Sequence, residues 1–327
     1  MTTPEKLQSL LDDAVAAGEE HACQLAVCVD GELFCDLAAG AADTRTLFPL
    51  FSAGKGVAVT AVLRLVERGV LELDAPVAAY WPEFATNGKE SITLRDVLTH
   101  RSGMHILPPA SFAELADWER MCDLLASRRP VGVPGTRTRY QPVTFAWLIG
   151  EPARRAGKKP FADIVRDEVL VPAGISDFGF GVSPEDESRT LPVYCAPEDA
   201  ADWRVGFIGE PAVRRACIPT ANAFGTARAL AKHYMAVLNG LLSPEMLAEA
   251  LTPPDRSSDP VKGWERFGLG YILWDGGAFG HGGALGAEGF AVPERSIAVG
   301  FATDTLRDEH PVRDRISAEL GLPARRW

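Results

Sequence analysis

A serine and a lysine three residues apart mark the stretch of this sequence with the clearest chemical potential. Ser52 follows a short apolar run that ends at Phe51, and Lys55 stands one helical turn further on. Apolar residues at helical spacing continue to Gly69, which predicts a mostly buried helix starting near Ser52. Residues three apart share a helix face, so the two side chains lie within reach of each other. A serine that only caps the helix gives the same pattern, and spacing alone leaves both interpretations open.

Nucleophilic catalysis is the chemistry that this pair would support. A serine hydroxyl is a weak nucleophile at neutral pH until a neighbouring base takes its proton. Lysine becomes such a base only where burial or nearby positive charge lowers its pKa. The apolar residues that follow Lys55 favour a semi-buried position and therefore the neutral amine.

Two residues further along could complete such a site. Tyr140 follows a Pro-Gly turn and precedes a predicted helix, so its hydroxyl can enter a cleft, where nearby cations would stabilise the phenolate. His281 lies in a glycine-rich run at residues 276–286, where backbone can approach a ligand and N–H groups can face an oxyanion. A packed tyrosine and a structural histidine are the alternative interpretations.

Composition excludes several other classes of protein. The chain has 327 residues, of which 46% are hydrophobic and 24% charged, and its formal net charge is -11. The chain has no basic run of the kind that would indicate a nucleic-acid partner. No stretch reaches the length of a membrane span, and the acidic amphipathic start at residues 1–22 is unlike a signal peptide, which favours a cytoplasmic location.

Cysteine and histidine spacing indicates neither disulfides nor metal. The six cysteines include no CxxC pair, and the Asp30-Gly31 turn would place Leu33 opposite Cys28, so a bridge from Cys28 to Cys35 would need a shift of register. The six histidines lack metal-binding spacing, and the glycine-rich run lacks the ending of a phosphate-binding loop. We expect reduced thiols, no metal and no cofactor; the oligomeric state is left open.

The elements that must position these residues predict an α/β (α+β) fold. Strand patterns occur near both chain ends and helical patches lie between them, which indicates one antiparallel sheet built from both ends, flanked by helices, with an inserted mainly helical region. We expect residues 1–71 and 221–327 to form the sheet domain, and residues 72–220 to form the insertion and the pocket wall. The predicted strands are residues 23–29, 32–37, 267–274, 286–292 and 297–303, and the predicted helical patches are residues 94–100, 112–125, 143–156, 161–170, 227–238, 244–251 and 312–320.

Several short motifs also occur in a familiar order. They are FSAGK at 51–55, LTHRSGM at 98–104, PGT at 134–136, Tyr140 and HGG at 281–283, with supporting segments at 69–77 and 80–84. Together they resemble the serine β-lactamase and penicillin-recognising superfamily, specifically its class C-like branch with the family VIII carboxylesterases. The resemblance runs from about residue 20 to 305 and implies a β-lactamase/transpeptidase-like fold.

The resemblance implies a role for each matching residue. Ser52 would be the acylated nucleophile, Lys55 its base, and Tyr140 the proton shuttle in deacylation. His281 stands where many relatives have the lysine of Lys-Thr-Gly. The N–H groups of Ser52 and Ala284 would form the oxyanion hole.

Two departures from the superfamily pattern bear on the substrate. The usual Tyr-x-Asn is replaced here by Tyr-Gln-Pro, so the amide that holds a β-lactam or peptide side chain is absent, and the residues left for substrate binding are Gln141, Gly282 and Gly283. Histidine is also largely neutral at pH 7, so His281 provides a weaker grip on a substrate carboxylate than lysine. Both changes favour an uncharged ester.

The sequence therefore supports a ranked set of functions. The first hypothesis is a serine hydrolase that acts on small carboxylic esters through an acyl-Ser52 intermediate. The alternative is an acyltransferase or transacylase of specialised metabolism, in which an amine or alcohol takes the acyl group. A β-lactamase or D-amino-acid peptidase fits less well, and a non-catalytic binding protein is disfavoured by the intact Ser52, Lys55 and Tyr140. The least regular segments, residues 108–129 and 183–217, are expected to form the walls that choose the small-molecule partner.

Overall fold

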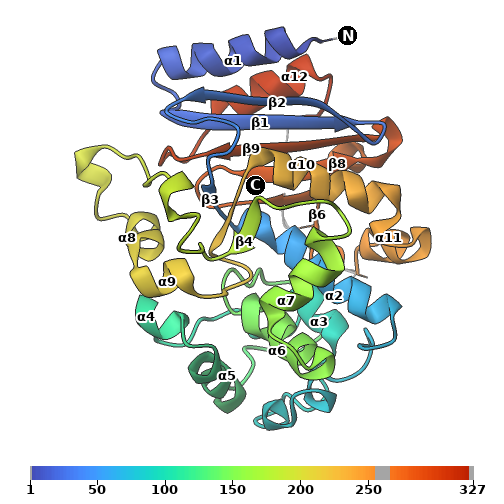
Figure 1. The fold of residues 1–327 in the computed structure, drawn as a ribbon. Coiled ribbons are helices and arrows are strands. Elements are labelled where there is room, and N and C mark those ends of the chain that lie inside the picture. The colour runs from blue at the N-terminus through green and yellow to red at the C-terminus, as the bar shows by residue number, and fades with distance from the viewer. Residues whose placement is uncertain (1, 255–265, 324–327) are drawn as a thin grey trace.

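A six-stranded antiparallel sheet with the strand order β2-β1-β9-β8-β7-β6 lies between α1 (Pro4–Ala16) and α12 (Pro311–Glu319) on one side and the larger helical part of the molecule on the other (Figure 1). The computed structural model describes residues 2–254 and 266–323. Strand β1 from the N-terminal end pairs along its length with β9 from the C-terminal end, which confirms the predicted sheet built from both chain ends. The strands are β1 (Ala22–Val29), β2 (Glu32–Gly40), β6 (Ile272–Leu273), β7 (Phe279–Gly282), β8 (Glu288–Val292) and β9 (Ile297–Thr303).

Helices cover both faces of this sheet (Figure 1). Side chains alternate along β1, so Leu25 and Val27 pack with α1 and α12, while Ala26 faces the opposite layer. That inner layer contains α2 (Lys55–Glu67) and α10 (Ala227–Ala236). Every described helix, within residues 2–254 and 266–323, is too short or too polar to cross a membrane.

The residues between α2 and α10 are mainly helical, as predicted. The predicted helix at 112–125 is in fact two helices, because the side chain of Asp117 accepts a hydrogen bond from the backbone N of Arg120 and begins the second one. The helices α8 and α9 were not predicted at all. The helices of this region are α3 (Leu94–Leu98), α4 (Phe112–Leu115), α5 (Trp118–Ser127), α6 (Phe145–Gly157), α7 (Phe161–Val165), α8 (Trp203–Gly209) and α9 (Pro211–Arg215); α11 (Pro244–Ala250) follows α10.

A second, three-stranded sheet was also not predicted. It has the order β3-β5-β4 and consists of β3 (Phe48–Phe51), β4 (Phe178–Phe180) and β5 (Ala223–Gly225). Strands of three or four residues are too short to show a clear alternation in the sequence. This small sheet positions Ser52, because β3 leads directly into that residue.

The predicted strand at 267–274 is shorter in the structure. Gly270 adopts φ +76 and turns the chain back, so that Phe267 forms an isolated bridge with Ile272 and only β6 remains as a strand. Likewise, the predicted strand at 286–292 begins later, at Glu288, because Gly286 has φ +99.

The hairpin of β1 and β2 has the predicted register at its turn. Cys28 lies opposite Leu33, and an irregularity after Val27 places Cys35 opposite Val27. All six cysteines are free thiols, and four of them are buried.

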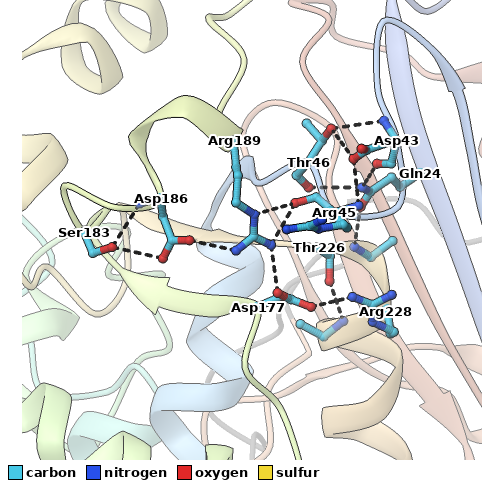
Figure 2. A network of polar contacts seen from close by, with 12 residues as sticks. Gln24, Asp43, Arg45, Thr46, Asp177, Ser183, Asp186, Arg189, Thr226 and Arg228 are labelled. Carbon is cyan, nitrogen blue, oxygen red and sulfur yellow. Dashed lines mark hydrogen bonds and ion pairs between the residues drawn. The ribbon is translucent and has the colours of Figure 1, made fainter.

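A network of polar contacts connects the region between α2 and α10 to the six-stranded sheet (Figure 2). The carboxylate of Asp177 accepts a hydrogen bond from Arg189 at 2.8 Å and a second one from Arg228. Arg189 also donates to the backbone O of Arg45, and Arg228 pairs with Asp36 on β2. Asp177 therefore joins segments that are distant in the sequence.

Replacing Asp177 tests this junction. Asp177→Asn removes the shared negative charge from Arg189 and Arg228 while keeping the side chain's size, and we expect it to lower the free energy of unfolding by about 2 kcal/mol. The matched control is Asp163→Asn, because Asp163 forms an exposed pair with Arg166 and should change stability by less than about 0.5 kcal/mol. Urea denaturation followed by circular dichroism measures both, and equal losses in the two variants would contradict the assignment.

Candidate active site

The chain enters the site through a strained residue. Strand β3 ends at Phe51, which has φ 48 and ψ -130, a conformation that is costly for a side chain with a Cβ. Ser52 follows and begins a short 3₁₀ turn, Ser52–Gly54, that continues into α2 at Lys55. The predicted helix is therefore present, and its first turn places the serine and the lysine on one face.

Lys55 is buried completely and contacts three oxygen atoms. Its Nζ lies 2.8 Å from Ser52 Oγ, 2.8 Å from the backbone O of Pro142 and 2.8 Å from the backbone O of Thr220. Burial lowers the pKa of Lys55 well below its ordinary value. A neutral amine has two N–H groups and one lone pair. The N–H groups can donate to the two carbonyls, which leaves the lone pair to accept the proton of Ser52.

Tyr140 lies beside this pair with its hydroxyl in the protonated form. Burial raises its pKa, and a side-chain hydrogen bond with Ser52 acts weakly in the opposite direction. The Nζ of Lys55 lies 5.2 Å from the centre of the tyrosine ring. The phenolate considered from the sequence is therefore not the resting form, and Tyr140 is placed to donate a proton.

The motif at residues 98–104 supports the tyrosine. The ring of Phe267 stacks on Tyr140 at 5.6 Å, and the ring of His100 meets its edge at 5.1 Å. The Nδ1 of His100 lies 3.3 Å from both the backbone N and the side-chain Oε1 of Gln141. Gln141 is fully buried and its amide also bonds Ser102, so the structure gives it contacts within the protein rather than a place on the pocket surface.

His281 lies on β7 as a neutral ring. Its Nδ1 donates to the backbone O of Gly282 at 2.8 Å, since a carbonyl can only accept. Burial lowers the pKa of His281 well below its ordinary value. The ring centre lies 5.9 Å from that of Tyr140. A neutral imidazole here provides no fixed positive charge for a substrate carboxylate.

The loop after His281 presses against the nucleophile strand. A Cβ on Gly283 would lie 2.1 Å from the backbone O of Leu50, so only glycine allows this approach. Ala284, the next residue, is exposed and lines the same pocket as Ser52. Both residues therefore border one space, and their role as an oxyanion hole stays a prediction.

These residues meet in a pocket of about 330 Å³. Ser52, Tyr140, His281, Gly282 and Ala284 line it. Lys55 lies beneath Ser52, and neither Gln141 nor Gly283 is part of the lining. The remaining lining residues are all apolar: Phe51, Leu107, Phe112, Leu115, Pro142, Val143, Trp203, Phe207, Ala221 and Ile272. A larger hollow of about 750 Å³ lies between α7 and β4, but none of the four predicted catalytic side chains lines it.

The sequence did not identify two kinds of functional group. The carbonyls of Pro142 and Thr220 bind Lys55 through the backbone, which leaves no side-chain signal. Of the ten apolar lining residues, only Phe112, Leu115, Trp203 and Phe207 fall within the expected segments 108–129 and 183–217, and none of the ten was named from the sequence as part of the wall. Among residues 2–254 and 266–323, no group of three His, Cys, Asp or Glu side chains could hold a metal ion.

Comparisons with known proteins agree with this geometry. The chain is 32% identical to Esterase/beta-lactamase LipL of Mycobacterium tuberculosis (strain ATCC 25618 / H37Rv) over 330 residues, which cover 86% of this chain and 76% of that protein. It is 30% identical to Esterase EstB of Burkholderia gladioli over 228 residues, 62% of this chain and 57% of that protein. The crystal structure of a family VIII carboxylesterase is similar with a TM-score of 0.86 at 28% identity, covering 98% of each chain.

The sequence profile of the Beta-lactamase family matches residues 7–322, nearly the whole chain. The chain belongs to the β-lactamase family and is a serine hydrolase of that family with esterase-like relatives.

Proposed function

We propose that this protein is an esterase that hydrolyses small carboxylic esters through an acyl group on Ser52. The contact of 2.8 Å between Ser52 Oγ and the buried Nζ of Lys55 carries the proposal, because it gives the serine a base. The relatives named as esterases support the substrate class.

In the proposed acylation step, the Oγ of Ser52 attacks the ester carbonyl and its proton passes to the Nζ of Lys55. The N–H groups of Ser52 and Ala284 stabilise the negative oxygen of the tetrahedral intermediate. Tyr140 then donates its proton to the departing alcohol and regains one from the protonated Lys55.

Deacylation repeats this route with water in place of the alcohol. Water attacks the acyl carbonyl, and Tyr140 takes a proton from it while passing its own hydroxyl proton to Lys55. The bond from Ser52 to the acyl carbon then breaks, Ser52 regains a proton from the protonated Lys55, and the carboxylic acid leaves.

A β-lactamase or D-amino-acid peptidase has less support. Substrates of both classes carry a carboxylate, and no charged side chain of the described residues lines the pocket, since Lys55 lies beneath Ser52. Burial also lowers the pKa of His281, so this residue provides no positive charge for a carboxylate. The cytoplasmic location stays a prediction, which the six free cysteines support.

Acyl transfer is the second candidate, and the apolar lining of the pocket favours it. A hydrophobic alcohol or amine bound against this lining would compete with water for the acyl group. The acyltransferase or transacylase of specialised metabolism therefore remains the alternative on the same residues.

Intact-mass measurement after exposure to p-nitrophenyl acetate tests the nucleophile. We expect the wild type to gain one acetyl group on Ser52, and Ser52→Ala to gain none and to lose at least about 10³-fold in kcat. Ser183→Ala, which changes an exposed serine, is the control and should behave as the wild type. Full activity in Ser52→Ala would refute the acyl-Ser52 intermediate.

The pH dependence tests the base. Because Lys55 must be neutral to take the proton of Ser52, kcat/KM should rise with pH through the lowered pKa of Lys55 and level off above it. Lys55→Arg stays protonated throughout and should lose at least about 10³-fold at every pH.

Lys89 offers a matched control for this variant. Lys89 is also fully buried and donates to the carbonyls of Thr86, Ala126 and Arg128, away from the pocket. Lys89→Arg should therefore keep the wild-type pH profile in whatever fraction remains folded. An unchanged profile in Lys55→Arg would exclude Lys55 as the base.

Product analysis separates hydrolysis from transfer. With p-nitrophenyl butyrate and increasing 1-hexanol or benzylamine, an esterase should yield butyric acid as its main product and release p-nitrophenol at a nearly constant rate. Faster release together with hexyl butyrate or the benzylamide as the main product would instead establish the acyltransferase.

A further inference from the structure

One wall of the pocket is a group of packed aromatic rings beside the nucleophile. The ring of Phe207 lies 5.5 Å from Phe112, 6.3 Å from Trp203 and 6.3 Å from Phe51, the residue before Ser52. We call Phe112, Trp203 and Phe207 the aromatic wall. They come from α4 and α8, so the inserted region supplies them.

The aromatic wall and Tyr140 have different neighbours. The aromatic wall meets the site through Phe51, at 6.1 Å from Trp203 and 6.3 Å from Phe207. Tyr140 packs against Phe267 and His281. In the proposed mechanism the alcohol receives its proton from Tyr140, so it must leave along that side. The space along the aromatic wall then remains for the acyl group.

The pocket lining determines whether a charged acyl group can bind. Apart from Ser52, Tyr140 and His281, every lining side chain of the described residues is apolar. A carboxylate or ammonium on the acyl chain would lose its water without gaining a partner there. An apolar chain would gain from burial instead.

The volume of the pocket limits the length of the acyl chain. A volume of about 330 Å³ has room for on the order of ten water molecules, so an acetyl group leaves most of it filled only by water. Each further methylene group replaces water against apolar side chains, up to the point at which the pocket is full.

The helix that carries Trp203 and Phe207 is also hydrogen-bonded to the loop after His281. Arg204, between Trp203 and Phe207 on α8, donates to the backbone O of Ala284 at 3.1 Å. Asp202 holds the same guanidinium with two hydrogen bonds, at 3.0 and 2.8 Å. A wall fixed before substrate arrives can discriminate between acyl groups at little ordering cost.

We propose that Phe112 and Phe207 select the acyl group of the substrate, and that this site takes uncharged esters whose acyl chain is aliphatic or aromatic and larger than acetyl. The acyl chain lies along the aromatic wall while the alcohol leaves past Tyr140. This inference rests on the proposed esterase function.

Two ester series test the assignment. With p-nitrophenyl esters of two, four, six and eight carbons, kcat/KM should rise about fourfold per methylene until the pocket is full. A p-nitrophenyl ester whose acyl chain ends in a carboxylate should be at least about 100-fold poorer than its neutral counterpart of equal length. A series of butyrate esters with alcohols of increasing length should show a much weaker dependence.

Variants locate the selecting residues. Phe207→Leu and Phe112→Ala should both move the preferred acyl length upward and leave the alcohol series unchanged. Phe161→Leu is the control, because Phe161 is equally buried but lies outside the pocket, and its length preference should match the wild type. Phe112 is only partly buried, so Phe112→Ala keeps the test valid if Phe207→Leu does not fold.

The results separate failure of this inference from failure of the proposed function. If acetate is the best substrate, if the carboxylate ester reacts equally well, or if the variants change the alcohol preference instead, the inference is wrong while acyl-Ser52 still forms. If no ester of either series acylates Ser52, the esterase function itself is wrong.

Discussion

The burial of an amine beside a serine, with only backbone oxygens for partners, is the interaction on which this site depends. The Nζ of Lys55 contacts the carbonyls of Pro142 and Thr220, and an ammonium ion in such a place lacks a countercharge. Deprotonation is the least costly response to that burial. The lone pair that results is available to Ser52. In the proposed mechanism, loss of solvent thus provides the base that a serine nucleophile needs.

The site around the amine is assembled from segments that are distant in the sequence. Lys55 begins α2, Pro142 precedes α6, and Thr220 precedes β5, which pairs with the strand that ends at Phe51. Lys89 is a contrast to Lys55, because it is also buried and donates to three backbone carbonyls and, at 3.4 Å, to the hydroxyl of Thr86, but it lies away from the pocket. What distinguishes Lys55 is its contact of 2.8 Å with Ser52, whose side chain lines the pocket.

The sequence predicted those features that are encoded in local patterns of side chains. Short apolar runs indicated β1 and β9, helical spacing indicated α2, and the Asp30-Gly31 turn indicated the hairpin register next to it. Very short strands such as β4 carry no such pattern, and backbone carbonyls carry none at all. The side chain of Gln141 has a suitable chemistry for substrate binding, but its direction is set by contacts with His100 and Ser102 from a distant segment. Features that depend on long-range packing were therefore missed.

Charge and substrate choice are coupled in this pocket. Burial favours the neutral form of Lys55, His281 and Tyr140 alike, so the resting site around Ser52 carries little charge. In the proposed mechanism charge appears only when Lys55 takes the proton and the oxyanion forms, so the N–H groups at Ser52 and Ala284 stabilise the transition state more than the bound ester. A carboxylate held next to Lys55 would raise the pKa of the amine and keep it protonated. In the proposed mechanism an anionic substrate would thus disable the base that it needs, so an apolar lining that disfavours such substrates would also preserve the nucleophile.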